Sequence, residues 1–108
     1  MHLKMPLRET DARRLLRRLL VEGIFVVSPH ARDEMRKDNL TDVDVVNTLR
    51  GGVVQPAEWE NGSWRYRGLT QRMAAVAAFE PDVEAVPADE DDVSEMELVV
   101  VTAWRQKS

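Results

Sequence analysis

Cysteine is absent from this chain of 108 residues, and histidine occurs only twice. The first absence excludes a disulfide framework, a thiol nucleophile and a thiolate metal site, and two histidines leave little from which to assemble a metal centre. No apolar run approaches the roughly 20 residues of a membrane span, and the opening sequence MHLKMPLRET lacks the apolar stretch of a signal peptide. We therefore expect a single cytoplasmic domain over residues 1–108, with no cofactor, no metal and no membrane contact.

Basic residues are absent from residues 80–97, which contain nine of the 19 acidic residues and two prolines. The formal net charge of −4 is due to this segment, because the rest of the chain is net positive. The negative net charge of the whole chain therefore does not exclude a nucleic-acid partner. A segment of this composition buries too little apolar surface to order firmly, so we expect a long mobile loop between two paired strands. Two interpretations stay open: a tolerated insertion, or an intramolecular decoy that shields a basic surface.

The first predicted helix begins with Thr10 as its N-cap and ends at Gly23. Its apolar side is formed at helical spacing by Ala12, Leu15, Leu16, Leu19 and Leu20. Its cationic side is formed by Arg13, Arg14, Arg17 and Arg18. Four guanidinium groups on one arc can neutralise several phosphates, but a solvated helix surface explains the same spacing.

Two further helices are marked by the residues that cap them. Ser28 and Pro29 are typical of the N-cap and the first helical position, and the helix that they begin ends near Asn39. Thr41 is a suitable N-cap for the third helix, which the pair Gly51-Gly52 ends. All three predicted helices therefore precede the middle of the chain.

After residue 52 the hydrophobic period changes to two, which predicts strands. The dipeptide Asn61-Gly62 is the strongest short-range hairpin signal and connects the first two of them. The strands are predicted at residues 53–60, 63–69, 73–79 and 98–104, and a short β-prone run lies earlier, at residues 24–27. This order predicts an α+β fold in which N-terminal helices pack on one face of a four-stranded or slightly larger antiparallel sheet.

The predicted strand at residues 63–69 separates aromatic from cationic side chains. Because side chains alternate, Trp64 and Tyr66 face one way, and Arg65 and Arg67 face the other. Aromatic rings near guanidinium groups are the materials of single-stranded RNA recognition, in which bases stack and phosphates pair with cations. The alternative is that the aromatic rings belong to the core and the arginines are solubilising.

His30 is the residue whose ordinary pKa suits acid or base catalysis near neutral pH. It follows Ser28 and Pro29, so it lies in the first turn of the predicted helix, where the helix dipole favours a bound phosphate. One interpretation is a catalytic or phosphate-contacting residue. The other is a structural hydrogen bond that fixes the start of the helix.

A resemblance to known proteins is carried by three stretches, SPHARDEMRKDNLTDVDVVNTLRGGVV, WRYRG and ELVVVTAW. Together they resemble small bacterial domains of the BrnT and MqsR kind, which belong to the RelE-like group of toxin mRNA interferases. The agreement spans roughly residues 24–105, apart from the acidic segment. The predicted helix from Thr10 to Gly23, followed by the short β-prone run at residues 24–27, looks like the opening of the MqsR branch. In combination these motifs are moderately specific, whereas each alone is weak.

The resemblance implies a RelE-like helical layer on a twisted antiparallel sheet, and a metal-independent ribonuclease that an antitoxin neutralises. Such cleavage needs the 2′-oxygen aligned with the phosphorus, cations that stabilise the phosphorane and a proton for the leaving 5′-oxygen. At the matching positions it implies phosphate stabilisation by Arg65 and Arg67, and proton transfer or base stacking by Tyr66. His30 is a further catalytic candidate, and the RNA-binding candidates are Arg32, Arg36, Arg72 and Arg105.

Two positions depart from related helices that begin with His-Ala, because Glu34 and Asp38 stand where those helices commonly carry basic residues. These charges, and those of the acidic segment within a Debye length of about 8 Å, would repel RNA. We therefore hold two hypotheses. The first is an mRNA-cleaving toxin whose partners are RNA and a cognate antitoxin. The second is a non-catalytic interaction or regulatory domain derived from such a toxin. The oligomeric state is left open.

Overall fold

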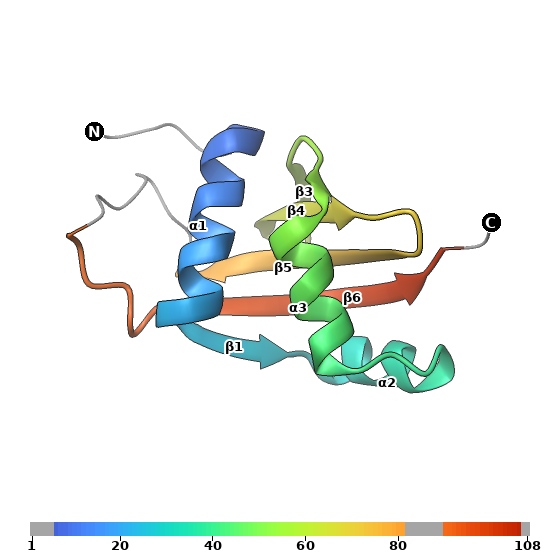
Figure 1. Cartoon of the computed structure of the whole chain (residues 1–108). Helices are drawn as coiled ribbons and strands as arrows, with labels where there is room; N and C mark the ends of the chain where they lie inside the picture. Colours follow the sequence, from blue (N-terminus) through green and yellow to red (C-terminus); the bar gives the residue numbers. More distant parts are fainter. Residues whose placement is uncertain (1–5, 82–89, 107–108) are drawn as a thin grey trace.

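The computed structural model describes residues 6–81 and 90–106. Within them the elements follow the order α1 (Glu9–Glu22), β1 (Ile24–Val27), α2 (Pro29–Lys37), α3 (Asp42–Gly51), β2 (Val53–Val54), β3 (Glu58–Glu60), β4 (Ser63–Leu69), β5 (Met73–Glu80) and β6 (Glu97–Arg105). Helices come first and most strands follow, so the predicted α+β class is confirmed (Figure 1).

The sheet is mostly antiparallel, with β1, β6, β5, β4 and β2 as successive neighbours and β3 paired to β4. Six strands take part, so the sheet is larger than four strands, and the expectation of a four-stranded or slightly larger sheet is met at its larger end. The expectation of purely antiparallel pairing is wrong for β1, which runs parallel to β6 along residues 24–27. The physical reason is the long connection from β1 through two helices and four strands, which returns the chain to the same edge in the same direction.

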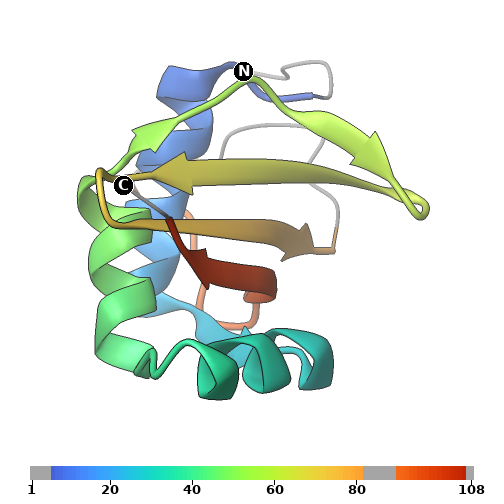
Figure 2. The same ribbon diagram turned by 90° about the vertical axis from the view of Figure 1, so that its right-hand side faces the viewer.

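Helices α1 and α3 cover one face of the sheet, and none of the described helices covers the opposite face (Figure 2). The core between α1, α3 and the sheet contains Leu15, Leu16, Leu19, Leu49, Phe79 and Leu98, each at most 1% exposed. Helix α2 instead lies beside β6 at one edge of the sheet, where Ala31 and Met35 are buried. The chain therefore has a closed face that forms the core and an open face.

Local caps explain two of the three helix starts. Ser28 accepts a hydrogen bond from the backbone N–H of Ala31 at 3.1 Å, as predicted. The prediction of Thr10 as the N-cap of α1 is wrong, because the helix begins at Glu9 and its N-cap is Arg8, with no capping side chain among the described residues. The chain enters α1 early because Leu7 is held in the core and donates its backbone N–H to the Tyr66 hydroxyl at 3.0 Å.

Helix α3 starts with a capping box. The backbone N–H of Asp44 donates to the Thr41 hydroxyl at 3.2 Å, and the backbone N–H of Thr41 donates to the Asp44 carboxylate at 2.9 Å. The backbone N–H of Thr41 and then its hydroxyl hold the pKa of Asp44 below its ordinary value. Because the folded-state pKa is the lower one, the ionised carboxylate stabilises the fold above the ordinary pKa, and this contribution is lost as the pH falls through the folded-state pKa.

Thr41→Ala removes the capping hydroxyl, so we expect the free energy of unfolding to fall by about 1 kcal/mol in urea denaturation at neutral pH. Thr10→Ala is the matched control, because Thr10 lies inside α1 and is exposed. The control should change stability by less than about 0.5 kcal/mol. Equal losses in the two variants would contradict the assigned caps.

The predicted strand at residues 53–60 is interrupted, and this is a correction. It divides into β2 and β3 around Pro56, which has no backbone N–H to donate to a neighbouring strand. The predicted hairpin at Asn61-Gly62 is confirmed, since both residues have positive φ, of 51° and 82°, and connect β3 to β4. Strands β2 and β3 therefore reach the same partner, β4, in two separate pieces.

The acidic segment connects β5 to β6, which pair antiparallel as expected. The expectation of mobility falls largely on residues 82–89, which lie outside the described residues. At the end that is described, Val93 is 2% exposed, and Arg18 of α1 donates a hydrogen bond to the backbone oxygen of Asp91 at 2.7 Å. This end of the segment therefore contacts the helical side of the molecule.

Candidate functional site

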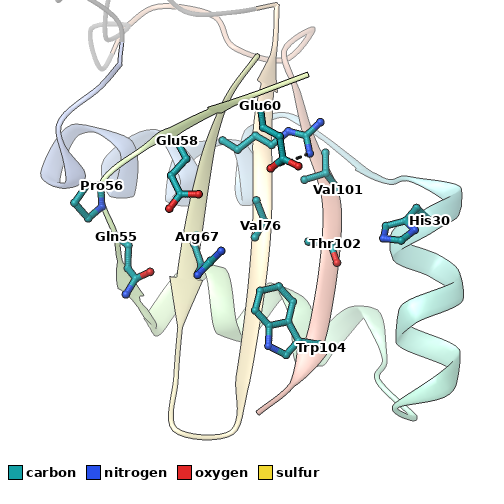
Figure 3. A pocket seen from close by; sticks show the side chains of 11 residues that line it. His30, Gln55, Pro56, Glu58, Glu60, Arg67, Val76, Val101, Thr102 and Trp104 are labelled. Carbon is teal, nitrogen blue, oxygen red and sulfur yellow. Dashed lines mark ion pairs between the residues drawn. The ribbon is translucent and has the colours of Figure 1, made fainter. Parts of the chain in front are cut away.

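The open face of the sheet is hollowed into a pocket of about 180 Å³ between the β2–β3 connection and helix α2 (Figure 3). Its ionisable side chains are His30, Glu58, Glu60, Arg65 and Arg67. Val76 of β5, together with Val101, Thr102 and Trp104 of β6, forms the remaining surface with Gln55 and Pro56. Strand alternation brings Arg65 and Arg67 to this face, so these two arginines meet His30 in one concavity.

Each of the two arginines has a defined neighbour. The guanidinium carbon of Arg67 lies 5.5 Å from the ring centroid of Trp104, a cation–π distance. Nη1 of Arg65 lies 3.8 Å from a carboxylate oxygen of Glu60, a loose ion pair. Nε of Arg65 is buried and has no hydrogen-bond partner in the part of the chain that the structure describes. An anionic oxygen that reached this nitrogen would satisfy a donor that the protein leaves unsatisfied.

Tyr66 does not join the arginines, which corrects the role in proton transfer or base stacking that the resemblance implied for it. The side chain is 1% exposed on the closed face, with its ring centroid 5.0 Å from that of Phe79. Its hydroxyl accepts the hydrogen bond from Leu7, as described above. Trp64, which shares this face, packs against the core. The cause is the alternation that the sequence already displayed, because adjacent residues of a strand cannot point to the same face.

His30 lies at the edge of the pocket, in the first turn of α2. Its side chain is 70% exposed, and Nε2 lies 3.9 Å from a carboxylate oxygen of Glu34. Glu34, which stands where related helices commonly carry a basic residue, is therefore an acidic neighbour of His30.

The other predicted RNA-binding arginines do not line the pocket. Arg32 pairs with Asp42, and Arg36 lies 3.3 Å from Asp33. Arg105 donates to the backbone oxygen of Asp38 through Nε at 3.3 Å and Nη2 at 3.1 Å. Arg72 lies exposed in the turn between β4 and β5. None of these four residues lines the pocket, so the structure does not bring them into it with Arg65 and Arg67.

Asp38, the other acidic residue at a position where related helices commonly carry a basic one, has a structural role. Asp38 follows α2, and its carboxylate accepts a hydrogen bond from the backbone N–H of Arg105 at 2.9 Å. Its backbone oxygen accepts the guanidinium of the same arginine. The acidic residue therefore fastens the end of α2 to the end of β6.

The cationic side of α1 is also separate from the pocket. Arg17 donates through Nε to the backbone oxygen of Arg50 at 3.1 Å, and Arg18 donates to Glu22 at 3.0 Å. Helix α1 covers the closed face of the sheet (Figure 2), whereas the pocket lies on the open face, so the helix that carries these arginines and the pocket are on opposite sides of the sheet. Arg14 and Arg17 are exposed, whereas Arg13 and Arg18 are half-buried, so only part of the arc is a solvated helix surface.

Several pocket residues were not found by sequence reasoning, namely Gln55, Glu58, Glu60, Thr102 and Trp104. Simple alternation fails along β6, because the register against β5 shifts between Val76 and Ala77. Val76 faces Thr102 and Ala77 faces Val100, so Val101 is an extra residue. Both Val101 and Thr102 therefore line the pocket.

Comparison with known proteins finds no family model that matches the chain, no similar curated protein and no similar solved structure. Among residues 6–81 and 90–106, no group of three or more His, Asp or Glu side chains is close enough to hold a metal ion. None of the described helices is both long and apolar enough to cross a membrane.

Proposed function

We propose that the open-face pocket binds single-stranded RNA and that the protein is a metal-independent endoribonuclease, the toxin of a toxin–antitoxin pair. The observation that carries this proposal is the meeting of Arg65, Arg67 and His30 in one concavity beside Trp104. Cations, an aromatic ring and a residue able to transfer protons are the components that binding and cleavage of an RNA strand require. The motif resemblance supports the same reaction class.

In the proposed reaction the 2′-oxygen attacks the adjacent phosphorus, the bond from phosphorus to the 5′-oxygen breaks, and a 2′,3′-cyclic phosphate forms. Arg65 and Arg67 supply positive charge for binding, and their guanidinium groups stabilise the phosphorane as its charge develops. Glu60 accepts the proton of the 2′-hydroxyl, and the imidazolium of His30 donates a proton to the leaving 5′-oxygen. Tyr66 takes no part, because it lies on the closed face.

Purified protein incubated with single-stranded RNA in EDTA should produce fragments that end in a 2′,3′-cyclic phosphate. We expect His30→Ala to slow cleavage about a hundredfold, which is typical of the loss of a general acid. Arg67→Ala should weaken RNA binding about tenfold. Arg36→Ala is the matched control, because Arg36 is exposed outside the pocket, and its cleavage rate should stay within about twofold of the wild type. Unchanged cleavage in His30→Ala, Arg65→Ala and Arg67→Ala would reject the site.

A second candidate function is a non-catalytic interaction or regulatory domain derived from such a toxin. It is favoured by the carboxylates of Glu34, Glu58 and Glu60 at or beside the pocket, which weaken the attraction for phosphates. Harmless overexpression in bacteria, together with no RNA binding at low salt, would support this candidate. Growth arrest that a co-expressed antitoxin relieves would support the toxin.

A further inference from the structure

The pocket contains two carboxylates beside its arginines, although a site for phosphates alone would be weakened by them. Glu60 is engaged by Arg65. The Glu58 side chain has no ion pair or hydrogen bond with any residue of the described ranges, and Glu58 stands directly across from Arg65 in the β3–β4 pairing. Figure 3 shows its carboxylate on the same side of the pocket as the guanidinium of Arg67. A ligand that reaches this side therefore meets an unpaired acceptor and a cationic donor together.

A carboxylate and a guanidinium on the same side of a pocket can distinguish among the four RNA bases, because each base carries a different set of donors and acceptors. Guanine carries two adjacent N–H donors, at N1 and N2, which match the two oxygens of a carboxylate. Its neighbouring edge carries two acceptors, O6 and N7, which match the parallel N–H groups of a guanidinium. Adenine offers an amino donor beside N7, cytosine offers a single amino group, and uracil offers one imino donor between two carbonyls. Guanine alone satisfies a carboxylate and a guanidinium in full.

The two arginines differ in a way that suits separate tasks. Arg67 lies against the ring of Trp104, which restricts the direction of its guanidinium. Arg65 has the buried Nε without a partner and lies beside Glu60. A guanidinium in a restricted orientation favours recognition of a base edge, whereas an unsatisfied buried donor favours a phosphate oxygen.

We infer that Glu58 and Arg67 form a guanine-recognition subsite, so that the RNA bound in the pocket carries a guanine at this position. The inference rests on the proposed function, because it assumes that the ligand is RNA. Glu58 accepts from N1 and N2 of the base, Arg67 donates to O6 and N7, and Arg65 remains for the phosphate.

Binding of fluorescently labelled pentanucleotides, measured by anisotropy in EDTA at low salt, tests the subsite. The probes are four uridine pentanucleotides with guanosine, adenosine, cytidine or uridine at the centre, all with 2′-O-methyl groups that prevent cleavage. We expect the guanosine probe to bind about tenfold more tightly than the other three. Inosine, which lacks the N2 amino group, and 7-deazaguanosine, which lacks the N7 acceptor, should each bind several-fold more weakly than guanosine.

Glu58→Gln should reduce the preference for guanosine to about twofold or less, because one amide oxygen cannot accept both N–H groups equally well. Glu60→Gln removes the same charge from the same hairpin, and it should change the affinity for all four probes by the same factor. Thermal denaturation of both variants verifies that they fold. A guanosine preference that survives Glu58→Gln, or equal affinity of wild-type protein for all four probes, would reject the subsite and leave RNA binding intact. Failure of every probe to bind would instead reject the proposed function.

Discussion

Gly52→Ala is expected to lower the free energy of unfolding by about 3 kcal/mol, which would remove a large part of the stability of a domain this small. A Cβ atom at this position would lie 2.5 Å from the backbone oxygen of Thr48 and 2.7 Å from that of Leu69. Both neighbours are backbone atoms, which cannot rotate away as a side chain would. The residue has a φ of −76°, so the requirement for glycine comes from the close approach of α3 to β4 rather than from backbone conformation.

Gly51→Ala provides the control from the preceding position. In the described part of the chain, no atom lies within 4 Å of the Cβ position at Gly51, which is the last residue of α3. Alanine favours the helix over glycine, so we expect the free energy of unfolding to be unchanged or to rise by up to about 1 kcal/mol. Urea denaturation followed by circular dichroism measures both variants. If the two alanines were equally destabilising, the packing of Gly52 against β4 would be wrong.

Tyr66→Ala is expected to destabilise the protein by about 3–5 kcal/mol, because it leaves a cavity beside Phe79 and removes the acceptor for the backbone N–H of Leu7. Tyr66→Phe keeps the ring and removes only the acceptor, so its expected loss is about 1–3 kcal/mol. Both losses are measured by thermal and urea denaturation.

The same tyrosine variant separates a structural role from a catalytic one. Because the phenol lies on the closed face, Tyr66→Phe should cleave RNA at the wild-type rate at a temperature where it is fully folded. A folded Tyr66→Phe protein that had lost cleavage would show that the tyrosine reaches the substrate. That outcome would move the site away from the open face.

Local signals in the sequence predicted many of the element boundaries. Ser28 and Thr41 are N-caps as expected, Gly23 ends α1, and the Asn61-Gly62 turn connects two strands. These features depend on hydrogen bonds and φ angles within a few residues, so the local sequence determines them. Thr10 is the exception, because a contact across 59 residues, from Leu7 to Tyr66, sets where α1 begins.

Arrangements that depend on distant residues could not be predicted in the same way. The parallel pairing of β1 with β6 joins positions that are more than 70 residues apart, and neither run indicates its partner. The site shows the same limit. Alternation along β4 predicted the separation of Tyr66 from Arg65 and Arg67, whereas the register shift at Val76 depends on the pairing of two strands. The local β3–β4 hairpin places Glu58 across from Arg65, whereas only the assembled sheet brings His30 to the arginines.

Helix α2 is anchored to the sheet at both of its ends, and this has a consequence for molecular recognition. At its start, the backbone N–H of Ser28 donates to the backbone oxygen of Val100 at 2.9 Å. At its C-terminal end, the hydrogen bonds between Asp38 and Arg105 attach the helix to the last residue of β6. The backbone segments that carry His30 and Trp104 are therefore held in a fixed arrangement at one wall of the pocket. If the pocket binds RNA as proposed, association loses less conformational entropy, because this wall does not have to be immobilised by the incoming strand.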